Sequence, residues 1–382
     1  MSSYLAIKEI WRNKGRFFLF SLVIALITTL VLFIAALAQG LATANKEYIE
    51  KLNAELLIFQ SNTELSTTAS RIGWDKLNDI RRIPGVKDVG PIGFANGTII
   101  FKDHHEPLDV TLIGVEPGKP GLPPVFQGTN IRAQRGNFVV IDGNVAARTN
   151  IKLGDEITIK TTKGTDEEFT SLKVIGITDG RQYFFQPSIF LPFQTWNKIR
   201  PQSAAINNEN QQIANIVAVQ LLNPDEIDSM TKLIMTTVSD VDVVDRVTAY
   251  EASPGYQAQQ STLNTQRGFT LLIGILVIGG FFQIQTLQKV PQIGVLKAIG
   301  TSSSSVAVSI IMQIVVVTIL GVTLGTFGTY LLTRFLPTGI PISLSGSTAM
   351  VAIASLLLIG PIGGLVSVRL ALKVEPLRAL GM

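Results

Sequence analysis

The chain has no cysteine and few charged residues for its 382 residues. Without cysteine no disulfide framework can hold a domain together, and the redox state of the compartment cannot be read from the sequence. Charged residues make up 16% of the chain, whereas ordinary globular proteins carry about 25%. The apolar residues must therefore be concentrated in particular segments.

The apolar residues are concentrated in long segments that contain no Asp, Glu, Lys or Arg. These segments are 17–45, 268–288, 298–333 and 335–368. Each can include the roughly 20 apolar residues with which a helix crosses a bilayer. The sequence therefore predicts a membrane α-helical protein with four transmembrane helices, at 17–40, 268–287, 305–333 and 346–368. Ala36-Leu37-Ala38 fits a signal-peptidase site, but the apolar run before it exceeds the 7–15 residues of a secretory signal, so we expect a retained helix.

Basic residues are distributed unevenly around these spans. Residues 41–266 hold 21 basic and 26 acidic residues, and the remainder holds 11 basic and 2 acidic. Because Lys and Arg collect in short cytoplasmic connections, we expect the lead-in 1–16, the connection 288–304 and the tail 369–382 to be cytoplasmic. The acidic region 41–267 is then extracytoplasmic. The basic excess belongs to the membrane part, so we expect no nucleic-acid partner.

The region 41–267 has the pattern of an α+β domain on two helical stalks. The apolar stripe of 41–59 and the breaker-free stretch 256–267 predict the stalks. Helices are predicted at 74–83 and from the cap at Asn223 to about residue 238. β-branched runs predict strands at 98–102, 108–115, 138–142, 156–160, 172–177 and 216–222.

Motifs of enzyme chemistry are missing from the sequence. No GxxxxGK[ST] phosphate loop and no Gly-x-Ser-x-Gly motif occurs. The only two histidines, His104 and His105, have Glu106 and Asp109 nearby and could ligate a metal or haem, but no second cluster completes a site. We interpret them as a polar turn, and we expect neither an enzyme active site nor a resident cofactor or metal.

Polar side chains within the predicted spans form the second group of candidates. They are Thr28, Thr29, Gln283, Gln285 and Gln313. Such groups are unfavourable in lipid and form hydrogen bonds between helices. They indicate helix packing, a dimer contact or a substrate path.

Four stretches of the sequence resemble one protein family. QIGVLKAIGTSSSSV, from Gln292, resembles the cytoplasmic segment after the second span of FtsX-like, MacB-type ABC-transporter permeases. LAIKEIWRNKGRFFLF resembles their amphipathic lead-in, RLALKVEPLRALG resembles their C-terminus, and the segment with Leu153-Gly154-Asp155 resembles part of their extracytoplasmic domain. The family has a glutamate where this chain has Gln292, which removes one negative charge.

The resemblance implies a homodimeric permease subunit driven by a separate cytoplasmic ABC ATPase, itself a dimer, that binds ATP and Mg. Its other expected partner is membrane lipid, and an extracytoplasmic accessory protein is left open. The resemblance places ATPase coupling in a group of neighbouring residues: Gln292, Ile293, Gly294, Val295, Leu296, Lys297, Ala298, Ile299 and Gly300. In this family, closure of the ATPase moves the transmembrane helices, and the stalks relay the motion.

Three functions remain compatible with the sequence. The first is export of a hydrophobic or amphiphilic substrate such as haem, a lipid, a peptide or an antibiotic. The second is ATPase-coupled signalling without transport, as in control of cell-wall hydrolases or peptide sensing. The third is a membrane-anchored receptor domain without an ATPase.

Overall fold

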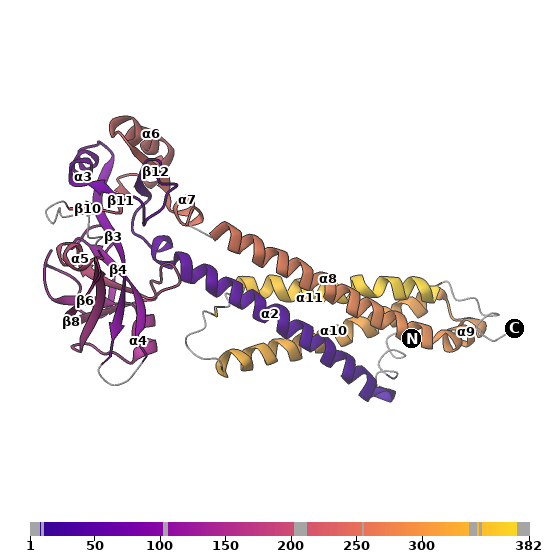
Figure 1. The fold of residues 1–382 in the computed structure, drawn as a ribbon. Coiled ribbons are helices and arrows are strands. Elements are labelled where there is room, and N and C mark those ends of the chain that lie inside the picture. Colours follow the sequence, from indigo (N-terminus) through magenta and orange to yellow (C-terminus); the bar gives the residue numbers. More distant parts are fainter. Residues whose placement is uncertain are drawn as a thin grey trace. The chain divides into compact units, whose positions relative to one another are not determined.

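The structure is a computed structural model and describes residues 8, 11–101, 106–201, 212–253, 256–335, 342–343 and 346–372. The chain divides into two compact units (Figure 1). The helical unit comprises Met1–Gly40 and Gln260–Met382, and the mixed unit comprises Leu41–Gln259. The mixed unit therefore corresponds closely to the predicted extracytoplasmic region 41–267.

The helical unit is built from long apolar helices. They are α2 (Lys14–Glu50), α8 (Tyr256–Gln288), α10 (Ser303–Phe335) and α11 (Gly346–Leu372), with the short α9 (Val290–Ala298) between α8 and α10. Among the described residues, α2, α8 and α10 are long and apolar enough to cross a membrane. The fourth predicted span, 346–368, lies in α11, whose described apolar stretch of 349–364 is shorter than a crossing needs. The fourth crossing stays a prediction.

Both predicted stalks are helical, but the first is shorter than expected. Residues 256–267 form the first turns of α8, as predicted. α2 ends at Glu50, so the prediction of a helix to residue 59 is wrong beyond that point. Leu56, Leu57, Ile58 and Phe59 are all fully buried, and four apolar residues in succession suit a strand covered on both faces.

The mixed unit contains a ten-stranded sheet and a separate two-stranded one. Strand order in the large sheet is β12-β1-β11-β3-β4-β9-β6-β8-β5, with β7 pairing β3 and β8. The strands are β1 (Leu56–Gln60), β3 (Val86–Ile100), β4 (Leu108–Val115), β5 (Val125–Gly128), β6 (Phe138–Ile141), β7 (Glu156–Lys163), β8 (Asp166–Thr178), β9 (Ser188–Pro192), β11 (Ile216–Leu221) and β12 (Val241–Asp245). The small sheet pairs β2 (Ile72–Gly73) with β10 (Ile213–Ala214).

The described residues of this unit also form short α-helices: α3 (Trp74–Arg81), α4 (Gly143–Thr149), α5 (Phe193–Ile199), α6 (Ile227–Thr237) and α7 (Arg246–Glu251). All six predicted strands and both predicted helices are confirmed; the strand at 108–115 has the predicted bounds, and the others have shifted ends. The predicted cap is also present, because the Asn223 side chain accepts a hydrogen bond from the N–H of Asp225 before α6. The α+β class is therefore confirmed.

Close packing of α5 against the sheet depends on two glycines. Gly93 on β3 and Gly114 on β4 are directly paired across the strands. A Cβ atom at either position would lie about 2.5 Å from the Trp196 side chain. The absent side chains leave the space that this fully buried indole fills.

Candidate functional site

The predicted coupling segment, 288–304, is mostly helical. α9 begins at Val290 with Pro291 in its first turn, where a proline removes no helical hydrogen bond. Gly300 follows the helix with a φ of +95°, and its N–H donates to the carbonyl of Lys297 at 3.0 Å. Glycine adopts this left-handed conformation without steric cost. The segment is therefore a short helix with a glycine-capped end, and only its last residues form a loop.

The apolar side chains of α9 divide into a covered and an uncovered group. Ile293 is buried and packs with Val306 and Ile310 of α10, and Gly294 is buried as well. Val295 and Ile299 are 42% and 77% exposed. These two uncovered side chains are available to a partner surface.

The other predicted coupling residues differ in exposure. Gln292 and Ala298 are exposed, and Lys297 is half-buried. The side chain of Leu296 lies outside the described part of the structure. Gln292 also lines a cavity of about 260 Å³. Its neutral amide can donate and accept hydrogen bonds there, which a carboxylate at this position could not do.

Polar side chains in the spans make contacts between helices of the same chain. The hydroxyl of Thr29 donates to the carbonyl of Gly325 on α10 at 3.1 Å. The buried Gln313 accepts a hydrogen bond from the Lys289 ammonium at 3.1 Å. Gln283 is half-buried. Two side-chain atoms, Thr28 Oγ1 and Gln285 Nε2, are buried without a hydrogen-bond partner in the described structure.

Glycines allow α2 and α10 to pack closely. A Cβ atom on Gly321 would lie 2.5 Å from Ile24, and one on Gly325 would lie 2.5 Å from the carbonyl oxygen of Ala25. These two glycines form a GxxxG pair of the kind that brings membrane helices together. The pair thus packs helices within one chain.

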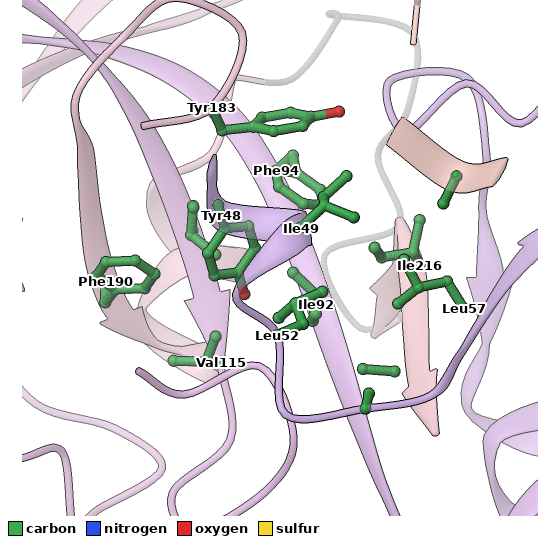
Figure 2. Close-up of a cluster of buried hydrophobic side chains, with 14 of the residues drawn as sticks. Tyr48, Ile49, Leu52, Leu57, Ile92, Phe94, Val115, Tyr183, Phe190 and Ile216 are labelled. Carbon is green, nitrogen blue, oxygen red and sulfur yellow. The ribbon is translucent and has the colours of Figure 1, made fainter. Parts of the chain in front are cut away.

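The last turns of α2 are embedded in the core of the mixed unit (Figure 2). Tyr48 is fully buried, its ring lies 5.5 Å from that of Phe190, and its hydroxyl donates to the carbonyl of Gly121 at 2.8 Å. Burial raises the pKa of the Tyr48 phenol well above its usual value. Ile49 and Leu52 are buried in the same cluster. This cluster fixes the end of the stalk to the domain.

Charged groups surround the same attachment point. Lys51 donates to the carboxylates of Glu47 at 2.8 Å and Asp179 at 3.0 Å. Arg181 donates to Asp179 at 2.7 Å and to the backbone carbonyl of Lys51 at 2.7 Å. Burial raises the pKa of Asp179, but the hydrogen bonds from Arg181 and Lys51 outweigh it and leave that pKa lowered. The network therefore holds Asp179 ionised beside the helix end.

A strained hairpin turn contacts α2 beside this network. Tyr183 and Gln186 exchange two backbone hydrogen bonds, and the central residues Phe184 and Phe185 have φ of +50° and +65°. Two central residues with positive φ define a type I′ turn, which favours Asn and Gly. The Phe185 N–H donates to the carbonyl of Ala44 at 3.1 Å, and both phenyl rings are over 40% exposed. Bulky side chains thus occupy an unfavourable backbone conformation.

This strain is measurable by substitution. We expect the double variant Phe184→Asn/Phe185→Gly to be more stable than the wild type. Its free energy of unfolding should be about 1–3 kcal/mol higher, because the turn strain is relieved. Phe184→Ala/Phe185→Ala is the matched control, since it removes the rings and keeps non-glycine residues at positive φ. Thermal unfolding checks this, and equal midpoints for the two double variants would contradict it.

Asp142 occupies a buried position at the start of α4. Its carboxylate accepts hydrogen bonds from the backbone N–H groups of Val145 and Ser188 at 2.9 and 3.0 Å. Burial raises the pKa of Asp142 to about 6, although these hydrogen bonds act in the opposite direction. α4 also borders a shallow cavity of about 800 Å³. Phe126 and Leu153, both exposed, form part of its wall.

The raised pKa has a consequence for stability. Between pH about 4 and about 6 the folded chain keeps a proton on Asp142 that the unfolded chain has lost. This residue therefore makes the free energy of unfolding fall as pH rises through that window, by about 3 kcal/mol in total. Asp142→Asn should remove this component, so unfolding midpoints of variant and wild type should differ by a pH-dependent amount; parallel profiles would contradict it.

The histidine pair His104 and His105 lies outside the described residues. Among the residues that the structure describes, no group of three or more His, Cys, Asp or Glu side chains is arranged to hold a metal.

Two family models match the chain. The MacB-like periplasmic core domain matches residues 17–249, and the FtsX-like permease C-terminal domain matches 268–376. This chain belongs to the FtsX-like, MacB-type ABC-transporter permeases. Permeases of this kind act with an ATPase partner, so the predicted permease role and the need for a partner ATPase are confirmed.

Curated relatives span the whole length of this permease. A protein of Staphylococcus haemolyticus named as a hemin transport system permease, HrtB, is 30% identical over 99% of each chain. An uncharacterized ABC transporter permease of Mycobacterium tuberculosis is 21% identical over 99% of each chain. The periplasmic region of MacB from Actinobacillus actinomycetemcomitans, a solved structure, is 15% identical and covers 53% of this chain and 94% of its own, with a TM-score of 0.38.

The sequence did not reveal the contacts that several residues of the permease make. Tyr48 lay in the predicted stalk stripe, but its partner Gly121 is distant along the chain. Arg181 and Asp179 are close together in sequence, yet their link to Lys51 appears only in the fold. Phe184 and Phe185 occupy a type of turn that usually contains Asn-Gly, so the sequence does not indicate a turn at this position.

Proposed function

We propose that this permease uses ATP hydrolysis by a separate ATPase to export hemin or a similar amphiphilic molecule. The observation that carries the proposal is the chain-long similarity to relatives named as hemin transport system permeases. Hemin is a planar, largely apolar molecule with charged edges, and a protein with both lipid-facing and extracytoplasmic parts suits its release from a membrane. The chain has apolar helices and an α+β domain of this kind.

The ATPase contact in this proposal is α9. Val295 and Ile299 are uncovered, and exposed apolar side chains on a short helix are costly to hydrate unless a partner covers them. Gln292 is exposed beside them and would supply a neutral hydrogen bond to the ATPase. The ATPase binds ATP and Mg, and two ATPase subunits would serve a permease homodimer.

Movement would pass along α2 and α8. Both helices run without a break through residues of the membrane and extracytoplasmic parts, 14–50 and 256–288. Tyr48 and the Lys51–Asp179–Arg181 network fix the end of α2 within the domain. In this proposal both termini and α9 face the cytoplasm, four helices cross the membrane, and an accessory protein can join on the outer side.

The simplest test of the proposal compares hemin tolerance and cell-associated hemin in two bacterial strains. A strain that expresses the permease with its ATPase should tolerate hemin and lower its cell-associated hemin. A strain with a hydrolysis-dead ATPase should do neither. If both strains clear hemin equally while the ATPase still co-purifies with the permease, the chain is a signalling partner of the ATPase. If no ATPase co-purifies, the permease proposal fails altogether.

A further inference from the structure

The cavity of about 260 Å³ in the helical unit is lined by a combination of groups that the proposed function leaves unexplained. Three basic side chains converge on it from three segments: Lys8 of the lead-in, Arg12 at the start of the helical region and Lys289 between α8 and α9. Thr301, Ser305 and Ser309, which carry hydroxyl groups, also line it.

The charged side chains that the structure describes in the lining of the cavity are all basic. Residues 1–40 and 260–382 include only two acids in the sequence, Glu9 and Glu375, both outside the part of the chain that the structure describes. The Lys289 ammonium donates to the Gln313 side-chain oxygen at 3.1 Å, within the same lining. Basic side chains that line one small space favour the binding of an anion there.

The backbone adds to the positive potential. α10 begins at Ser303, so Thr301 and Ser305 place its first turn at the cavity. The first N–H groups of a helix lack helical partners and carry the positive end of its dipole. The Ser302 hydroxyl accepts from the Ser305 N–H, which caps one of these donors at the start of α10.

The rest of the lining combines the amides of Gln292 and Gln313 with an apolar wall. Ile293, Val306 and Ile310 line the cavity and belong to the same small hydrophobic cluster. A free phosphate would gain nothing from such a wall, whereas the glycerol and upper acyl carbons of a phospholipid would pack against it. The cavity also lies at the ends of apolar helices, where a membrane protein meets lipid headgroups.

We propose that this cavity binds the phosphate headgroup of an anionic phospholipid. Lys8, Arg12 and Lys289 pair with the phosphate, the serine and threonine hydroxyls donate to its oxygens, and the apolar wall accepts the start of the acyl chains. The site borders α9, so lipid composition would modulate the coupling proposed above. The inference rests on the cavity and not on ATP-driven export.

The test is native mass spectrometry of the full-length permease with phosphatidylglycerol or phosphatidylcholine, without ATPase or ATP. The wild type should retain phosphatidylglycerol selectively. Lys8→Gln/Arg12→Gln should lose roughly 30-fold in apparent affinity, because each basic residue near a membrane surface contributes about fivefold. Lys14→Gln, a basic residue of the same segment that does not line the cavity, should bind as the wild type does.

Further variants separate the alternatives. Ser309→Phe keeps every charge but fills the cavity, and it should also lose selective retention. Equal loss in Lys14→Gln, or unchanged retention in Lys8→Gln/Arg12→Gln, would overturn the proposal. Inorganic phosphate that displaces phosphatidylglycerol at equal concentration would assign the cavity to a free anion. If Lys8→Gln/Arg12→Gln retains lipid as the wild type does but no longer co-purifies with the ATPase, the cavity binds a protein partner instead. Either result contradicts the lipid assignment.

Discussion

Replacement of Tyr48 by alanine should lower the free energy of unfolding of the mixed unit by about 3–5 kcal/mol, the usual cost of emptying a large aromatic site in a core. The ring is fully buried and contacts Phe94 and Phe190, with ring centroids 5.9 and 5.5 Å away. The variant also leaves the Gly121 carbonyl without the hydroxyl donor. Thermal unfolding of the purified full chain, followed by a probe in the mixed unit, measures the loss.

Tyr48→Phe is the matched control for this variant. It keeps the ring and removes only the hydrogen bond to Gly121, so its cost should be about 1–2 kcal/mol. In transport assays at a temperature where both variants remain folded, Tyr48→Ala should also be the weaker exporter, because α2 is less firmly attached. If both variants unfold at the wild-type midpoint, the attachment of the stalk does not depend on this cluster.

Replacement of Gly300 by valine should lower ATP-driven export at least tenfold while insertion and ATP hydrolysis continue. Gly300 has a φ of +95°, and a β-branched residue there is strained by about 1–3 kcal/mol. The chain relieves the strain by changing the turn after α9, which moves Val295 and Ile299 relative to α10. Export and ATP hydrolysis measured in the same membranes separate coupling from catalysis.

Gly268→Val is the matched control for the turn. Gly268 lies within α8 without a positive φ and with no atom within 4 Å of a Cβ at that position, so valine should leave export near the wild-type level. Full export in Gly300→Val would mean that the turn after α9 does not transmit movement, and would contradict the coupling role.

The main elements could be predicted because their signals are local. The charge-free stretches became α2, α8 and α10, and β-branched runs such as 108–115 became strands with the same bounds. The short strands β12 and β1 were not predicted. Acidic residues interrupt the apolar residues of β12, and β1 is too short to be distinguished from a stalk helix by its pattern alone. Its pairing with β11 and β12 decides its conformation.

The candidate sites were predictable only in part. The family resemblance directed attention to α9, but which of its apolar residues stay uncovered depends on Val306 and Ile310, which lie on another helix. The basic cavity joins Lys8, Lys289 and Ser309, residues that are separated along the chain. No spacing rule links such positions, because helix packing brings them together.

Hemin release from sealed proteoliposomes tests the central claim most directly. The vesicles would contain the permease and its ATPase, with hemin in the membrane and an acceptor protein outside. The account predicts ATP-dependent transfer of hemin to the acceptor, abolished with a hydrolysis-dead ATPase and lowered at least tenfold by Gly300→Val. Transfer at the same rate without ATP, or none while ATP is hydrolysed, would contradict ATP-driven export.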